Sequence, residues 1–336
     1  ITDHNNMFGA VEFYKAARAA NIKPILGSEV NLVPEDRRDP DVRRSGTIVL
    51  LCRDEAGYRN LCYLLSRAHM DTPPRVSTPR IDRGLLAERS EGFVALSGSL
   101  SGEIPQLLLK GDERGAAELA RHYSGLFPGA FFLEVVRSGI REQDKVNAGL
   151  LALSEELEIP LVGTTDAHYL DKGDASAHEI LMCIQMGKLQ PDLDSPARIT
   201  DDLYLASTAE VTERFSDLPE ALDNTQRVAD MCDVTLDLGK NYLPNYPVPD
   251  GDTPASYLTR VSEEGLNERL RFARESGLEP DEQVYRDRLQ VELDIIDQMD
   301  FPGYFLIVWD FIRYARENNV PVGPGRGSGA GSLVAY

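Results

Sequence analysis

The chain has 336 residues, 42% of them apolar, and a formal net charge of −20, which predicts two globular domains, or one large barrel with an extension, and excludes a disordered chain. The acidic balance argues against a DNA-binding surface over most of the chain, because contacts to phosphate need Lys and Arg. Four distant cysteines without a CxxC pair indicate reduced thiols in a cytoplasmic protein, and no apolar run reaches the roughly 20 residues that span a bilayer.

The first 170 residues alternate between helix and strand patterns. Apolar residues at helical spacing predict helices over residues 7–20, 55–69, 116–127 and 143–157. Short apolar runs predict strands over residues 24–30, 47–52, 93–96, 131–136 and 160–164. This order predicts an α/β fold with a largely parallel sheet, either open or closed into a barrel.

The rest of the chain is predicted to be mainly helical. The pattern becomes helical from about residue 175 to 231, and a segment rich in Pro and Asn, 241–251, then marks a domain boundary. Beyond it, charged amphipathic helices are predicted over 256–275 and 281–299, followed by a more apolar helix over 303–316.

Five glycines alternate with small, hydroxyl or cationic residues in the last part of the sequence, 323–336. Glycine lets backbone N–H groups approach an anion closely, and arginine offers a forked donor that fits phosphate. If Leu333 begins a helix, its free N–H groups point at the same place. The segment is therefore predicted to cradle a nucleotide triphosphate, through Gly325, Arg326, Gly327, Ser328 and Ser332. A flexible linker is the alternative, although an apolar helix before the segment and an apolar run after it argue against one.

Imidazole and carboxylate side chains form a second candidate site. Five of them fall in or just past a predicted strand, or where a helix leads into a loop: His4, Glu29, His69, Asp166 and His168. The carboxyl ends of barrel strands converge on one face, so these side chains are expected to meet there. Imidazole nitrogen with carboxylate oxygen suits Zn²⁺, Mn²⁺ or Fe²⁺ better than Ca²⁺. The alternative is a set of capping or surface residues, which is our interpretation of His122 and His178.

Five stretches of the sequence carry a resemblance to a known family. They are residues 2–9 (TDHNNMFG), 23–30 (KPILGSEV), 165–169 (TDAHY), 301–311 (FPGYFLIVWDF) and the glycine-rich segment. In this order they resemble the family C replicative DNA polymerases, the alpha subunits of bacterial DNA polymerase III.

The resemblance implies two modules. Residues 1–238 would be a PHP (polymerase and histidinol phosphatase) domain, a distorted (β/α)7 barrel, in which the five residues above match positions of a metal cluster. Residues 239–336 would be the first, mainly helical part of a palm of the polymerase-beta-like nucleotidyltransferase type. In that palm the loop at Gly327 and Ser328 contacts the phosphates of the incoming nucleotide.

The sequence departs from the family pattern in three places. The usual start of the PHP domain, with its His-x-His pair, is absent, and the sequence begins at Ile1 without Met. Ser99 stands where many relatives have a cysteine ligand, and serine is a poor ligand unless ionised. The catalytic carboxylates of the palm would lie beyond Tyr336. We therefore expect the chain to be a piece of a longer protein, truncated at both ends.

The resemblance implies a replicative DNA-directed DNA polymerase that adds deoxynucleotides to a primer 3′ hydroxyl, with Mg²⁺ held outside this fragment. Its partners would be primer–template DNA, deoxynucleotide triphosphates and replicase subunits such as the sliding clamp. Two further hypotheses concern the PHP domain. It could be a metal-dependent phosphoesterase, such as a 3′–5′ proofreading exonuclease with Zn²⁺ or Mn²⁺, or a non-catalytic scaffold that docks a separate proofreading subunit. The charge of −20 fits a protein-facing surface better than a DNA-facing one.

Overall fold

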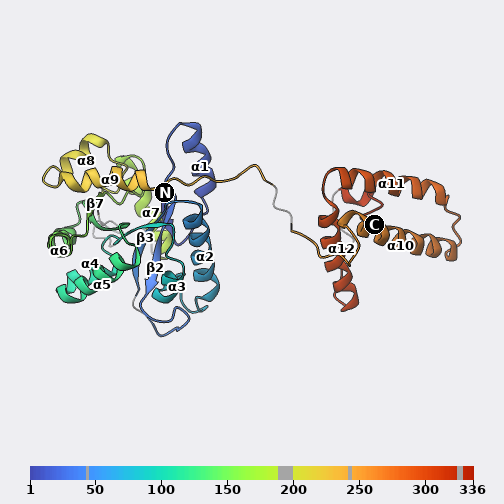
Figure 1. Ribbon diagram of the computed structural model, residues 1–336, viewed down its shortest axis with the longest axis horizontal. Coiled ribbons are helices and arrows are strands. Elements are labelled where there is room, and N and C mark those ends of the chain that lie inside the picture. The colour runs from blue at the N-terminus through green and yellow to red at the C-terminus, as the bar shows by residue number, and fades with distance from the viewer. Residues whose placement is uncertain (43–44, 188–199, 241–243, 324–327) are drawn as a thin grey trace. The chain divides into compact units, whose positions relative to one another are not determined.

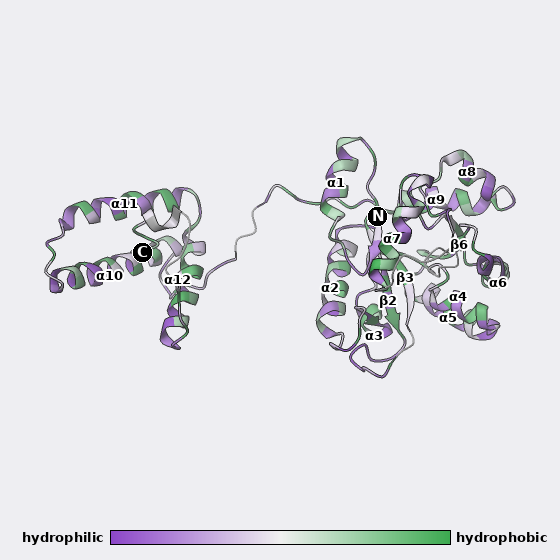
Figure 2. Cartoon of the chain, turned by 180° about the vertical axis from the view of Figure 1, so that it is seen from behind, coloured by the Kyte–Doolittle hydropathy of each residue, from purple (hydrophilic) through white to green (hydrophobic). Residues whose placement is uncertain are grey.

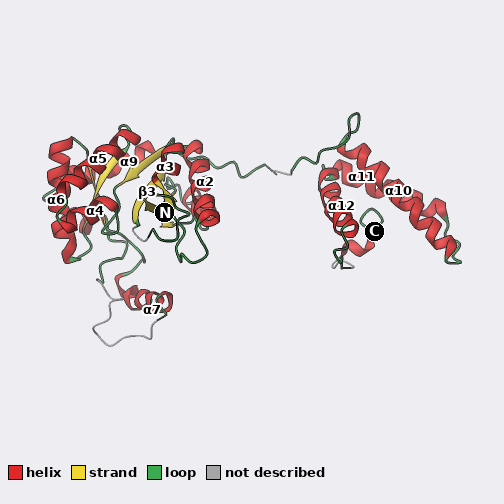
Figure 3. Ribbon diagram, turned by 90° about the horizontal axis from the view of Figure 1, so that it is seen from below, coloured by secondary structure: helices red, strands yellow, loops and turns green. Residues whose placement is uncertain are grey.

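The computed structural model describes residues 1–42, 45–187, 200–240, 244–323 and 328–336 (Figure 1). The chain divides into two compact units, Ile1–Leu236 and Asp237–Tyr336. Unit 1 is mixed α/β, and unit 2 is built from helices and loops in its described part (Figure 3). Across the described ranges, no helix has both the length and the apolar character needed to cross a membrane.

One sheet runs through unit 1. Its strands are β1 (Thr2–His4), β2 (Gly27–Val33), β3 (Gly46–Cys52), β4 (Ile81–Asp82), β5 (Phe93–Leu96), β6 (Phe131–Val136) and β7 (Leu161–Thr164). The order is β1-β2-β3-β5-β6-β7, with β4 paired to β2. Only β3 runs against its neighbours, so the prediction of a largely parallel sheet is confirmed with one exception. The connection between β2 and β3 contains no helix in its described part, and the two strands pair antiparallel.

The strand predicted over residues 24–30 is displaced by three residues in the structure. The apolar run suggested 24–30, whereas β2 covers Gly27–Val33. Asn31 is polar, but its backbone N–H donates to Asn5 Oδ1 at 2.8 Å and its side chain donates to Pro79 O at 3.2 Å. These bonds satisfy the amide inside the sheet, so the strand continues to Val33.

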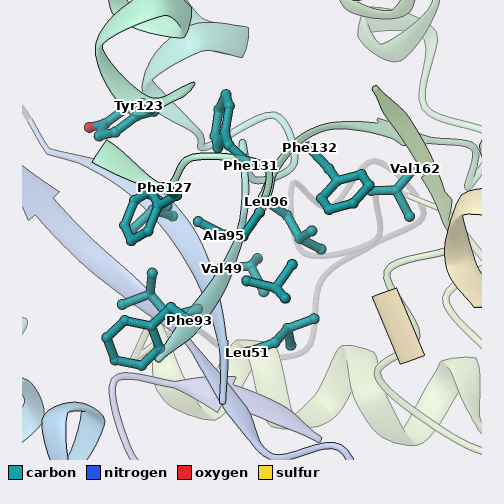
Figure 4. Packing of buried hydrophobic residues seen from close by; sticks show 14 of the residues in the cluster. Val49, Leu51, Phe93, Ala95, Leu96, Tyr123, Phe127, Phe131, Phe132 and Val162 are labelled. Atoms are coloured by element: carbon teal, nitrogen blue, oxygen red, sulfur yellow. The ribbon is translucent and has the colours of Figure 1, made fainter. Parts of the chain in front are cut away.

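Unit 1 also contains helices, most of which flank the sheet. They are α1 (Ala10–Ala19), α2 (Glu55–Asp71), α3 (Arg83–Glu88), α4 (Glu103–Lys110), α5 (Glu113–Leu126), α6 (Arg141–Leu157), α7 (Ala175–Gln185), α8 (Thr208–Arg214) and α9 (Pro219–Met231), with a 3-10 turn η1 (Lys172–Asp174). The Asp112 side chain accepts the Gly115 N–H at 2.9 Å, so α5 begins three residues before the predicted start. The core lies between helices and strands, and Figure 4 shows Val49, Ala95 and Phe132 among its side chains.

Unit 2 contains α10 (Pro254–Glu275), α11 (Glu282–Gln298), α12 (Pro302–Glu317) and the 3-10 turn η2 (Ser328–Gly331). Polar and apolar residues alternate in colour along α10 and α11 (Figure 2), as expected for amphipathic helices. Apolar residues of α10, α11 and α12 meet in a separate small core: Leu258, Leu266, Leu270, Leu289, Leu293, Ile296 and Leu306. The three predicted helices of this part are confirmed, with boundaries within two residues.

Candidate metal centre and glycine-rich segment

The first pair of candidate ligands joins the neighbouring strands β1 and β2. The parallel register places His4, the last residue of β1, beside Glu29, and His4 Nδ1 lies 3.5 Å from Glu29 Oε2. The Glu29 side chain is 10% exposed and the His4 side chain 60% exposed. The pair therefore reaches from the buried interior of the sheet to the surface at the carboxyl end of β1.

The second pair, Asp166 and His168, follows β7. His168 Nε2 lies 3.3 Å from Asp166 Oδ1, and the hydrogen bond between them raises the pKa of His168, although burial acts in the opposite direction. Asp166 has a φ of 52°, a left-handed conformation that turns the chain sharply after the strand. The backbone N–H of His168 also donates to Leu203 O at 2.7 Å, which connects this loop to the segment before α8.

The two pairs meet although their strands lie at opposite ends of the strand order. The rings of His4 and His168 stack with centroids 5.9 Å apart, while β1 and β7 are the first and last strands of the sheet. This contact requires a sheet that curls until its two edges approach each other. Unit 1 therefore resembles part of a barrel, with imidazoles and carboxylates gathered at one end.

Two other histidines border these pairs. His69, near the end of α2, places Nε2 3.0 Å from Asn5 O, so this nitrogen donates its proton and leaves Nδ1 as the ring's acceptor. His178 on α7 lies 5.3 Å from His168 between ring centroids. The interpretation of His178 as a mere surface residue is therefore incomplete, because it packs against a candidate ligand. His122 lies exposed on α5 beside Tyr123.

Glu134 was missed by the sequence reasoning. It lies on β6 with 8% exposure, its Oε1 accepts the Thr164 hydroxyl at 2.7 Å, and its buried Oε2 has no hydrogen-bond partner among the described residues. Burial raises the pKa of Glu134 to about 7, and the nearby Glu29 and Asp166 carboxylates act in the same direction, against the hydrogen bond from Thr164. The available signal was an acidic residue inside an otherwise apolar strand, FFLEVV.

The serine that contacts Glu29 is Ser101, not Ser99. Ser99, at the usual cysteine position, lies in the turn after β5, where its carbonyl accepts the Gly102 N–H at 2.8 Å. Ser101 instead directs its hydroxyl to Glu29, with Oγ 3.4 Å from Oε1. Ser101 therefore orients the carboxylate that pairs with His4.

The chemistry of these donors suits a divalent cation. Within the described ranges, no three imidazole, thiol or carboxylate groups are already gathered as a complete metal site. However, two imidazole–carboxylate pairs share one end of the sheet, and Glu134, whose Oε2 is buried, interacts electrostatically with the acidic member of each pair. Such an oxygen needs either a proton or a cation, because burying an uncompensated charge is costly. Imidazole and carboxylate together fit Zn²⁺ or Mn²⁺.

The glycine-rich segment is described only in its second half. Gly325, Arg326 and Gly327 lie outside the described residues, and Ser328 begins η2. Ser332 donates its hydroxyl to Glu292 Oε2 at 2.8 Å, and the Val334 N–H donates to the same oxygen at 3.1 Å. Leu333 lies in a turn, not at the start of a helix. Backbone N–H groups in this part are therefore directed partly to a carboxylate of unit 2.

The sequence of the chain matches two families of domains. Residues 1–138 match the PHP domain, and residues 256–336 match the bacterial DNA polymerase III alpha NTPase domain. All of the chain aligns with DNA polymerase III subunit alpha of Pseudomonas fluorescens at 45% identity and of Escherichia coli strain K12 at 40%. The resemblance to the DNA polymerase III alpha subunit is confirmed.

The chain spans 29% of the length of each of these two alpha subunits. The alpha subunit of Treponema pallidum is similar at 41% identity, again over the whole chain and over 28% of the relative. The PHP match contains His4, Glu29, His69 and Glu134, whereas Asp166 and His168 lie beyond it. The match to the alpha NTPase domain contains all three helices of unit 2 apart from the first two residues of α10.

Proposed function

We propose that the chain is part of a replicative DNA-directed DNA polymerase. The observation that carries the proposal is the similarity of the whole chain to polymerase III alpha subunits at 40–45% identity. In this proposal residues 1–238 are a PHP domain with a distorted (β/α)7 barrel, and residues 239–336 open a polymerase-beta-like palm. The curled sheet of unit 1 and the helices of unit 2 support this division.

The glycine-rich segment would bind the triphosphate of the incoming deoxynucleotide. Backbone N–H groups at Gly325, Gly327 and Ser328 would approach the phosphate oxygens, and the Arg326 guanidinium would act as a fixed positive charge. The primer 3′ oxygen attacks the α-phosphorus, the bond from that phosphorus to the bridging oxygen breaks, and pyrophosphate leaves. Mg²⁺ would neutralise charge on the phosphates from ligands outside this chain. The chain alone is therefore expected not to polymerise.

The whole polymerase would work in the cytoplasm on primer–template DNA, with a sliding clamp and other replicase subunits as partners. Primer extension by the full-length polymerase that contains this chain tests the role of the segment. Arg326→Ala should raise KM for nucleotide and lower kcat while primer–template affinity changes little, whereas Arg316→Ala on α12 serves as the matched control. Normal nucleotide incorporation by Arg326→Ala would contradict the assignment.

A second function is favoured by the donors in unit 1. His4, Glu29, His69, Asp166 and His168, together with Glu134, would hold Zn²⁺ or Mn²⁺, which supplies a Lewis acid for phosphoester hydrolysis. The residues would bind and orient a phosphodiester at the carboxyl end of the strands, as in a 3′–5′ proofreading exonuclease. The competing role is a scaffold without catalysis that docks a proofreading subunit.

Metal analysis of the full-length protein separates these two roles. Tight stoichiometric metal that is lost in His168→Ala, together with exonuclease activity, would support the enzyme. His122→Ala changes an exposed imidazole on α5 and should retain both. If the purified protein holds no metal, and His168→Ala keeps full stability and an intact complex with the proofreading subunit, the scaffold is supported.

A further inference from the structure

The last residues of the sequence are fastened to the helices of unit 2. Leu333 and Val334 pack against its apolar core. The Arg269 side chain on α10 lies over the Tyr336 ring, 4.5 Å from its centroid, and donates to the Tyr336 carbonyl at 3.4 Å. The carboxyl side of the glycine-rich segment is therefore held by packing and by polar contacts.

Glu292 makes the central polar contact. It lies on α11 with 8% exposure, and its Oε2 accepts both the Ser332 hydroxyl and the Val334 N–H, at 2.8 and 3.1 Å. Its Oε1 accepts Arg288 Nε at 2.7 Å. Burial opposes the ionised form, but the bonds from Val334, Ser332 and Arg288 together lower the pKa of Glu292. Both oxygens of this carboxylate are thus committed to the protein.

Ser332 extends the contact into the chain that follows. Its hydroxyl donates to Glu292, and its oxygen accepts the Ala335 N–H at 3.2 Å. A hydroxyl that donates its single proton to a carboxylate has none to offer a phosphate. The described carboxyl side of the glycine-rich segment is consequently attached to α11 through Glu292.

We propose that Glu292 is a positioning residue that anchors Ser332–Ala335, the carboxyl side of the glycine-rich segment. Ser332 is then a tether to α11, not a direct phosphate contact. The effect of this anchor on nucleotide binding rests on the proposed function, because the anchor can change nucleotide affinity only if the segment binds the triphosphate. Fixing one end of a glycine-rich segment lowers the entropy that it loses on binding an anion.

Hydrogen exchange of the 336-residue chain tests the anchor without any nucleotide. In Glu292→Ala the Val334 and Ala335 amides should exchange about tenfold faster or more, since hydrogen bonds to charged groups are among the strongest. Glu292→Gln keeps an acceptor oxygen and should have a smaller effect. Ser332→Ala removes fewer packing contacts than Glu292→Ala, and it should accelerate exchange of the Ala335 amide more than exchange of the Val334 amide. Asp297→Asn changes an exposed acid on the same helix and should leave both amides protected.

Unchanged exchange at Val334 and Ala335 in folded Glu292→Ala would overturn the proposal. A second measurement, KM for deoxynucleotide in the full-length polymerase, separates this failure from failure of the proposed function. Faster exchange with a several-fold higher KM in Glu292→Ala supports both. Faster exchange with an unchanged KM supports the anchor and contradicts triphosphate binding by the segment.

Discussion

A methyl group added at Gly163 should strain β7 and the site that follows it. The Cβ of an alanine there would lie 2.8 Å from a ring carbon of Phe215, where ordinary contacts begin at 3.4 Å. Phe215 is fully buried, at 0% exposure, so its ring cannot move into solvent. Overpacking of this kind costs about 1–3 kcal/mol, offset in part by the about 0.4–1 kcal/mol that Gly→Ala gains through the unfolded state. Gly163→Ala should therefore destabilise unit 1 by about 1–2 kcal/mol.

Urea unfolding measures this cost, and the chain supplies an internal control. Trp309, the single tryptophan, lies in unit 2, so its fluorescence should report an unchanged transition while exchange of β6 and β7 amides reports the loss in unit 1. Gly125→Ala on α5 is the matched variant, because nothing lies within 4 Å of its added Cβ. It should stabilise the helix by about 0.5–1 kcal/mol.

The cause of the strain can be tested by making room for it. Phe215→Leu shortens the ring's side chain, so the double variant with Gly163→Ala should be more stable than the sum of the two single changes predicts, with a coupling of about 0.5–3 kcal/mol. Additive effects would refute the contact as the source of the cost. Because Gly163 precedes Thr164 and Asp166, a displaced β7 should also weaken any cation site at its end.

Two other predictions concern buried charges. Arg37 contacts both Asp71 and Asp82; burial opposes their ionised forms, yet the Leu85 N–H at Asp82 and the Arg37 guanidinium at both keep the pKa of each carboxyl below its usual value. These ion pairs contribute fully to the free energy of unfolding above about pH 4, and the contribution is lost as the pH falls further. Arg37→Met should therefore lower the free energy of unfolding by about 3–5 kcal/mol at pH 7 and by less at pH 3. An equal loss at both pH values in urea unfolding would contradict this. Glu134→Gln keeps an acceptor for the Thr164 hydroxyl but removes the carboxylate charge. Calorimetry should therefore show Mn²⁺ affinity lowered by about tenfold or more, whereas His122→Ala should bind Mn²⁺ as wild type does. Equal affinity in Glu134→Gln and wild type would exclude this carboxyl from the site.

Local signals made much of the fold predictable. Asp54 stands before an apolar periodic segment, and its side chain accepts the Gly57 N–H of α2, which begins at the predicted residue. Asp112 makes the same contact with Gly115, but the apolar pattern alone placed the start of α5 three residues too late. Pro302 likewise begins α12. The direction of β3 was not predictable in this way, because strand direction depends on which neighbours a segment pairs with after the chain has turned.

The candidate site was predictable in its residue types and less so in its composition. Asp166 and His168 are two residues apart after a strand, so one local geometry determines their pairing. Glu134 stands out in the sequence only as an acidic residue inside an apolar strand, since its relation to Glu29 and Asp166 depends on how distant parts of the chain come together. For Ser332, a hydroxyl beside glycines suggests phosphate binding, whereas its hydrogen bond to Glu292 depends on the packing of α11, which the sequence does not reveal.

The curl of the sheet explains why the site depends on parts of the chain that are distant in sequence. Parallel register brings Glu29 beside His4, and a sharp turn brings Asp166 beside His168, but neither pair provides more than one imidazole and one carboxylate. The third component comes from curvature, which sets His4 against His168, while Glu134 lies on β6, the strand next to β7. Anything that flattens the sheet should therefore separate the donors before it unfolds them, so loss of cation affinity should precede loss of secondary structure as urea rises.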